Sequence, residues 1–155
     1  MRNTVHTVRN NVLKMMLCIV MLCVASVFAV SASAASNQDL ATREQFLQLI
    51  NMERSKHGVS TVTIGSENLN RAAMARAEEL TRSYSYVRPN GKREFTILSE
   101  YNVTDAAVGE AYWAGCDTPE EAVEAWMNNS YFSACVLDQN VKTIGVGHYE
   151  GGEYG

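Results

Sequence analysis

A mixed fold of helices and a small sheet, the α+β class, is predicted by two kinds of pattern in this 155-residue chain. Three stretches, 42–56, 66–80 and 118–129, carry apolar residues at helical spacing behind a capping residue. In a fourth stretch, 141–149, Ile144, Val146 and His148 alternate with Thr143, Gly145 and Tyr149, which is typical of a strand with glycines on one side. About 120 residues remain after a leader is set aside, which suits a single domain with one modest core.

The first 34 residues are predicted to be a signal peptide. They hold three of the chain's 13 basic residues and none of its 17 acidic ones. An apolar run over 15–30 is followed by the small residues Ala32-Ser33-Ala34, which form a cleavage signature. A membrane-spanning helix is the competing interpretation, but it needs about 20 apolar residues. We therefore expect cleavage near Ala34, a secreted domain over 35–155, and no stable membrane anchor afterwards.

The charge of the remaining domain limits its partners. Without the leader, 10 basic residues face 17 acidic ones, which gives a formal charge of −7. A negative surface repels phosphate backbones and anionic lipid headgroups, so we expect no nucleic-acid partner. The oligomeric state is left open by the sequence.

Two of the four cysteines, Cys116 and Cys135, lie outside the leader. They flank the third predicted helix, which would hold them about 18 Å apart at ~1.5 Å per residue. A disulfide needs Cα atoms ~4.4–6.8 Å apart. The chain would have to double back along the helix for a bridge to form, so a bridge is disfavoured but remains open.

The first two predicted helices follow one another closely. Thr42 and Gln45 make a possible capping box, and Gly58 is a left-handed stop. Ser66 caps the second helix. Its stripe at spacings of three and four consists of Leu69, Ala72, Ala73, Arg76, Ala77 and Leu80. We expect its charged residues to form a solvated face; they are Arg71, Arg76, Glu78, Glu79 and Arg82.

The third predicted helix has the clearest start signal. Thr118 can cap it, Pro119 fits the first helical position, and Glu121 can complete a capping box. Trp126 is its largest apolar side chain and is expected to anchor it to the core. Before this helix, 88–91 is a strong turn signal, whereas 95–98 fits either a short strand or one helical turn.

The predicted strand over 141–149 ends in a predicted hairpin turn at 150–153. Little chain follows to form a return strand, and an unpaired sheet edge is costly. We therefore expect either that the domain is incomplete at its carboxyl end, or that another chain completes the sheet.

Several stretches resemble one known family when they are taken in order. They are LQLINMERSKHG at 47–58, the helix at 68–80, SYVRPNG at 85–91, GEAYWAG at 109–115, TPEEAVEAWMNNS at 118–130 and IGVGHYEGG at 144–152. Together they resemble the bacterial form of the CAP superfamily, which comprises cysteine-rich secretory, antigen 5 and pathogenesis-related proteins. The resemblance implies an α-β-α sandwich, in which helices cover both faces of a small antiparallel sheet.

The resemblance also implies a cleft, which in the family carries two histidines and one or two glutamates able to hold a divalent metal. Glu110 matches the family's glutamate. Tyr86 and Phe132 stand where the histidines belong, and Asn129 stands where animal members have a second glutamate. A catalytic metal needs about three protein ligands. We therefore expect no metal and no cofactor here.

The candidate ligand-binding residues are thus Tyr86, Glu110, Asn129 and Phe132. With Tyr112, Trp113 and Tyr131 they could wall an aromatic cleft, although simple core packing explains Trp113 and Phe132 equally well. Glu110 is expected to accept backbone N–H bonds that hold its segment in place.

The resulting prediction is a secreted, non-catalytic binding module for a lipid or sterol, a cell-wall glycan or a protein partner. The alternatives are a metal-dependent hydrolase or peptidase of the kind proposed for the family, and a decayed or truncated paralogue without function. No serine or cysteine in the sequence has a partner histidine at a recognisable spacing, which favours the binding module.

Overall fold

The computed structural model describes residues 38–107 and 109–151, and the compact unit considered below begins at Leu40. The predicted signal peptide and the end of the predicted hairpin turn lie outside the described residues. Within the described part, no helix has the length and apolar character needed to cross a membrane.

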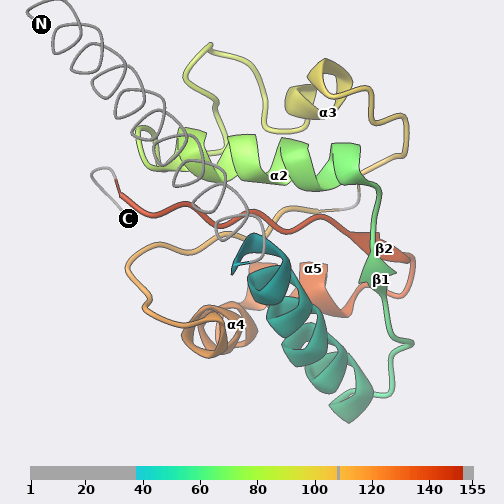
Figure 1. Cartoon of the computed structure of the whole chain (residues 1–155). Helices are drawn as coiled ribbons and strands as arrows, with labels where there is room; N and C mark the ends of the chain where they lie inside the picture. Colours follow the sequence, from blue (N-terminus) through green and yellow to red (C-terminus); the bar gives the residue numbers. More distant parts are fainter. Residues whose placement is uncertain (1–37, 108, 152–155) are drawn as a thin grey trace, which may run out of the picture. The chain divides into compact units, whose positions relative to one another are not determined.

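Helices make up most of the secondary structure in this unit (Figure 1). Residues 38–56 are helical, and Gly58 follows with a φ of 68°, the left-handed stop that the sequence predicts. The labelled helices are α2 (Glu67–Leu80), α3 (Thr96–Glu100), α4 (Pro119–Met127) and α5 (Ser130–Leu137).

Side-chain caps fix where two predicted helices begin. Ser66 Oγ accepts from the backbone N–H of Leu69 at the start of α2, and Thr118 Oγ1 accepts from Glu121 at the start of α4. Both predicted starts are therefore confirmed. Residues 95–98, which the pattern leaves open, enter the short helix α3.

The sheet is parallel, so the expectation of an antiparallel sheet is wrong. Strand β1 (Thr63–Ile64) pairs in parallel with β2 (Thr143–Ile144), Thr63 facing Thr143 and Ile64 facing Ile144. Helices α2 to α5 lie between the two strands in the chain. Such a long connection lets the chain return to the same end of the sheet and run in the same direction.

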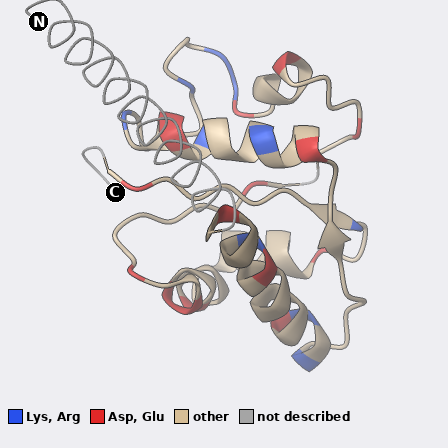
Figure 2. Ribbon diagram, viewed as in Figure 1, with Lys and Arg blue, Asp and Glu red and all other residues tan. Residues whose placement is uncertain are grey.

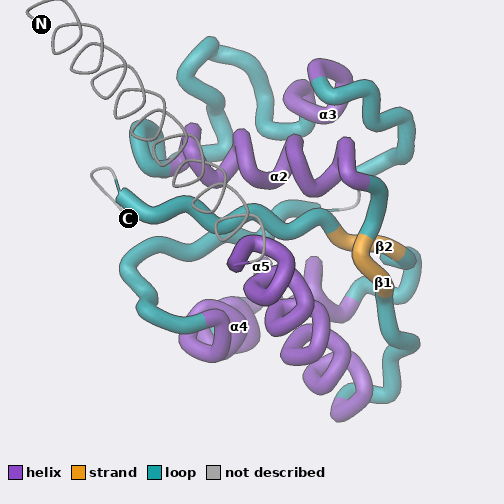
Figure 3. The backbone as a smooth tube through the Cα atoms, viewed as in Figure 1, coloured by secondary structure: helices purple, strands orange, loops and turns teal. Residues whose placement is uncertain are grey.

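Beyond β2 the chain stays extended and lies between two groups of helices (Figure 3). On one side, a Cβ built on Gly147 would come within 2.2 Å of the Ala73 carbonyl oxygen of α2. On the other side, the neighbouring Val146 is buried in the main core cluster. The other buried members of that cluster are Phe46, Ile50, Val62, Ala122, Val123 and Val136.

Trp126 joins α4 to the helix over 38–56, as the sequence predicts. Its ring stacks on Phe46 with centroids 5.6 Å apart and an interplanar angle of 26°. The end of that first helix is also tied to α5 by Arg54, which is fully buried. The Arg54 guanidinium donates to the backbone carbonyls of Val136 at 2.6 Å and Asp138 at 3.0 Å. Helix 38–56, α4 and α5 therefore form one packed group.

Candidate functional site

Glu110 lies in the extended segment before α4 and pairs with Arg76 of α2. The Arg76 Nε donates to Glu110 Oε1 at 2.9 Å, and the Arg76 side chain is only 5% exposed. A second guanidinium nitrogen of Arg76 donates to the backbone carbonyl of Ser85. Among the described residues, the partner of the Glu110 carboxylate is thus a side-chain cation, where the sequence led us to expect backbone N–H groups.

A second buried arginine extends this network away from Glu110. Arg88 is the first residue of the turn over 88–91 and donates to both carboxylate oxygens of Glu79, at 2.8–3.1 Å. It also donates to both oxygens of Glu100, at 2.7 Å and 2.9 Å. Because Glu79 also pairs with Arg76 at 3.5 Å, the charges form one chain across α2, the turn and α3. Figure 2 shows both charge signs along α2.

The environment of Glu110 is unusual for a carboxylate. Burial raises its pKa above the ordinary value, and the charge and hydrogen bond of Arg76 act in the opposite direction. The two more distant carboxylates Glu94 and Glu79 add a smaller increase. A desolvated carboxylate whose partner is fixed on a helix is suited to hold structure or to orient a neighbouring hydroxyl.

A group of aromatic side chains lies beside Glu110, and we call it the tyrosine cluster. Its members are Tyr84, Tyr86, Tyr112, Tyr131 and Phe132. Tyr112 is central, with ring centroids 4.9 Å from Tyr84, 5.1 Å from Tyr86 and 5.5 Å from Phe132. Tyr131 lies 5.9 Å from Tyr86 and 5.7 Å from Phe132. The rings meet edge to face or tilted, the arrangement that their quadrupoles favour.

The cluster combines two half-buried tyrosines, Tyr86 and Tyr112, with two more exposed ones, Tyr84 and Tyr131. Burial is the main reason why the pKa values of Tyr84, Tyr86 and Tyr112 are raised, and the nearby Glu110 carboxylate adds to the increase at Tyr86 and Tyr112. These phenols therefore stay protonated at neutral pH and can donate hydrogen bonds. Tyr131, by contrast, is 56% exposed. The cluster thus offers rings and hydroxyl donors at the protein surface.

The structure brings three of the four predicted site residues together. Tyr86 and Phe132 both contact Tyr112, and Glu110 acts electrostatically on Tyr86. The fourth, Asn129, caps α5: its Oδ1 accepts from the backbone N–H groups of Tyr131 at 3.0 Å and Phe132 at 3.2 Å. Asn129 therefore sets the start of the helix that carries two cluster rings.

A cavity of about 1230 Å³ adjoins this region. Tyr84, Glu110 and Tyr112 line it, together with many small apolar side chains of α2 and of the extended segments. Trp113 also lines it but is 46% exposed.

The two described cysteines are free thiols that lie near the site. Cys135 of α5 packs against Gly109: a Cβ built on this glycine would lie 2.5 Å from the Cys135 sulfur. Burial raises the pKa values of both Cys116 and Cys135, so neither is activated as a thiolate. The close contact at Gly109 helps to hold the segment that carries Glu110.

Arg76 and Glu79 are the site residues that the sequence interpretation missed, since they were assigned to a solvated face. Arg76 is 4% exposed, and the Glu79 side chain is also largely buried. The pattern did contain a signal, because Arg76 occupies a position of the apolar stripe of α2. A charge in a buried stripe needs a partner of opposite sign, and it points to an ion pair.

Comparison with known proteins gives a relative and a family. The chain is 28% identical over 124 residues to the uncharacterized protein YkwD of Bacillus subtilis (strain 168). The match covers 79% of this chain and 48% of that protein, so the chain spans about half the length of its curated relative. No solved structure matches. The sequence profile of the cysteine-rich secretory protein family, CAP, matches residues 47–155. Since the match takes in well over half of the sequence, the chain belongs to the CAP family.

Proposed function

We propose that this chain is a secreted, non-catalytic binding module, and that its tyrosine cluster binds a saccharide of the cell-wall glycan class. The observation that carries the proposal is the exposure of Tyr131 next to the half-buried phenols of Tyr86 and Tyr112. A flat ring offers an apolar surface to the C–H face of a sugar, and phenol hydroxyls both donate to and accept from its hydroxyl groups. Family membership and the basic, apolar leader support secretion.

The residues at the cleft do not fit a catalytic metal. Glu110 is already paired with a guanidinium, and an aromatic ring stands at each position where the family resemblance places a histidine. Among the described residues, no group of three or more His, Cys, Asp or Glu side chains could hold an ion. These observations favour binding over metal-dependent hydrolysis. A stoichiometric ion in the purified chain, or a hydrolase activity that Glu110→Gln abolishes, would reverse this ranking.

The proposal is tested by titrating the purified chain with a soluble chitin tetrasaccharide, as a cell-wall-like probe, in a calorimeter. We expect saturable binding that Tyr131→Ala weakens at least about fivefold, since the exposed ring supplies the stacking surface. Leu40→Ala, a change at another exposed apolar side chain that lines neither the cavity nor the cluster, is the control. Absent binding, or equal losses in the two variants, would contradict the proposal.

A lipid or sterol is the second candidate, and the cavity of about 1230 Å³ is the observation that favours it. Ligand cavities are mostly apolar with a few polar groups, and this one is lined largely by apolar side chains around Glu110. Ala77→Leu, which adds bulk to the lining, should then reduce uptake of a fluorescent fatty acid. Ala125→Leu adds the same bulk outside the lining and should leave uptake unchanged.

The layering of helices on both sides of the segment after β2 supports an α-β-α sandwich of the family type, with its sheet partly formed here. A paralogue that has lost its function is distinguished by unfolding. A decayed chain would melt without a cooperative transition, whereas a binding module with a packed core should unfold in one step.

A further inference from the structure

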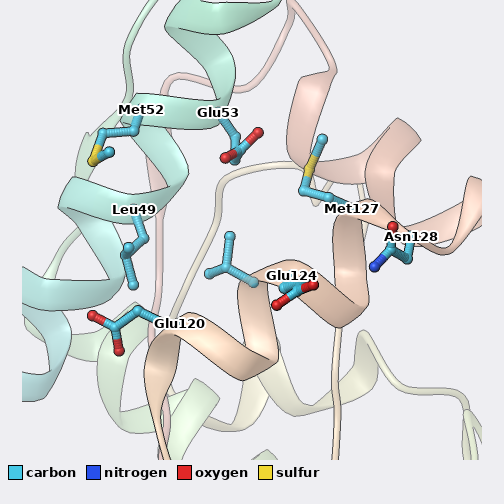
Figure 4. Close-up of a pocket in the computed structure, with 8 residues that line it drawn as sticks. Leu49, Met52, Glu53, Glu120, Glu124, Met127 and Asn128 are labelled. Atoms are coloured by element: carbon cyan, nitrogen blue, oxygen red, sulfur yellow. The ribbon is translucent and has the colours of Figure 1, made fainter.

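A second surface site lies between the helix over 38–56 and α4, and shares no residue with the tyrosine cluster. It is a groove of about 380 Å³. Its lining residues, which define what we call the methionine groove, are Leu49, Met52, Glu53, Glu120, Val123, Glu124, Met127 and Asn128. Figure 4 shows the side chains of Leu49 and Met52 on one wall, and those of Glu124 and Met127 on the other.

The floor of the groove is apolar and adaptable. Leu49 and Met127 are half-buried, and Val123 below them belongs to the core cluster. Met52 is 55% exposed, which is unusual for a side chain of this type on a domain surface. Methionine is unbranched and polarisable, so paired methionines can adjust to different apolar side chains. The floor therefore suits a bulky apolar group from outside.

The rim of the groove is acidic. Glu53, Glu120 and Glu124 line it, and none of the described lining residues is basic. Lys56 neutralises Glu53 at 2.6 Å, but Glu120 accepts only the neutral amide of Gln45, at 2.8 Å. Among the described residues, neither Glu120 nor Glu124 has an ion-pair partner within 4.0 Å. The rim thus carries unneutralised negative charge.

The apolar floor and the acidic rim together determine which kind of molecule can bind in the methionine groove. Carboxylates around an apolar floor repel anionic lipids and nucleic acid. A second copy of this chain is disfavoured too, because without the leader it brings a formal charge of −7 of its own. A helix with apolar residues at i, i+4 and i+7 and with flanking lysines or arginines satisfies both parts of the groove.

We propose that the methionine groove binds a basic amphipathic helix of a partner protein. An apolar side chain of that helix enters between Met52 and Met127, and its cationic side chains reach Glu120 and Glu124. The exposed carboxylates steer the encounter and fix its orientation, while the apolar floor supplies most of the affinity. The proposal is independent of the ligand at the tyrosine cluster.

The test uses the full chain and a dye-labelled helical peptide of about 16 residues that carries leucines on one face and lysines beside them. We expect saturable binding by fluorescence anisotropy, which weakens as salt is added because the rim contacts are exposed. The same peptide with glutamate in place of lysine should not bind. If both peptides bind equally, or neither does, the proposal is overturned.

Matched variants locate the contact. Glu124→Gln should weaken peptide binding about three- to tenfold, since it removes a rim charge and keeps the shape. Glu78→Gln changes an exposed carboxylate of α2 instead and should have no effect. Methyl NMR signals of Met52 and Met127 should shift on binding, while that of Met74 on α2 should not. Equal effects of the two glutamine variants, or a self-associated species that Glu124→Gln dissociates, would contradict a partner helix.

Discussion

At the residue scale, the carboxylate of Glu110 lies 2.9 Å from the Arg76 guanidinium, and both side chains are largely shielded from water. Such a pair recovers the cost of desolvation only while both partners are present. The buried guanidinium of Arg88 is held in the same way, by two carboxylates. The site is therefore built on paired charges whose separation should cost stability before it affects binding.

Replacing Arg76 with methionine should destabilise the domain by about 3–5 kcal/mol at neutral pH, because it leaves Glu110 buried without its cation. The double variant Arg76→Met/Glu110→Gln should recover part of that loss. Urea unfolding measures both. As a control, Arg82→Met at an exposed position just after α2 should change the free energy of unfolding by at most about 0.5 kcal/mol. Equal losses at Arg76 and Arg82 would show that the guanidinium of Arg76 is not buried with Glu110.

Glu110 should also give the domain a pH dependence of defined sign. Because its pKa is raised in the folded state, the folded protein holds this proton more tightly than the unfolded chain. Its contribution to stability is then fully present below the ordinary carboxyl pKa and is lost as the pH rises through the folded pKa. The free energy of unfolding of the wild type, relative to Glu110→Gln, should therefore fall as the pH rises from the ordinary carboxyl pKa through the raised pKa of the folded state. A rise over this interval would mean that Arg76 outweighs burial.

The sequence predicted the neighbours of some site residues but not of others. The grouping of Tyr86, Glu110 and Phe132 was predicted by a resemblance that carries positions from relatives. The partner of Glu110 was not, because Arg76 lies 34 positions away and joins it only through the packing of α2. Tyr84 carried no signal in any pattern, and its contact with Tyr112 arises from the same packing.

At the element scale, side-chain caps explain which helices the sequence could predict. Ser66 and Thr118 stand directly before apolar stripes, and both caps form. Helix α5 was missed because its residues are apolar on most sides, so no stripe is visible in SYFSACVL. The strand predicted over 141–149 is too long. Residues that alternate along the sequence indicate an extended backbone, but they do not indicate whether a neighbouring strand is there to pair with it. Thr143–Ile144 alone pairs, with β1.

Asn129 provides a test at this scale. Asn129→Ala should cost about 1 kcal/mol in urea unfolding, because two backbone N–H groups at the start of α5 lose their acceptor. Asn129→Asp keeps an acceptor oxygen there and should cost much less. If alanine were tolerated as well as aspartate, the cap would contribute nothing to α5.

At the scale of the whole molecule, the chain spans about half of its curated relative, and its leader lies outside the described residues. We propose that the leader is cleaved. Expression of the full sequence in a secreting host should give a product whose first residue is Ala35, as read by amino-terminal sequencing. Ala32→Arg should block this processing. A secreted product that retains Met1 would contradict it.

The closeness of Gly147 to the α2 backbone predicts which positions should vary least among related sequences. Ala73, whose carbonyl faces this glycine, lies one turn before Arg76 on the same helix. Because Gly147 has no side chain, the extended segment can lie directly against the α2 backbone, and this close approach fixes the distance between that segment and the helix that carries Arg76. A residue outside the tyrosine cluster can in this way change the cluster's surroundings, so related sequences should vary less at this glycine than at the cluster rings.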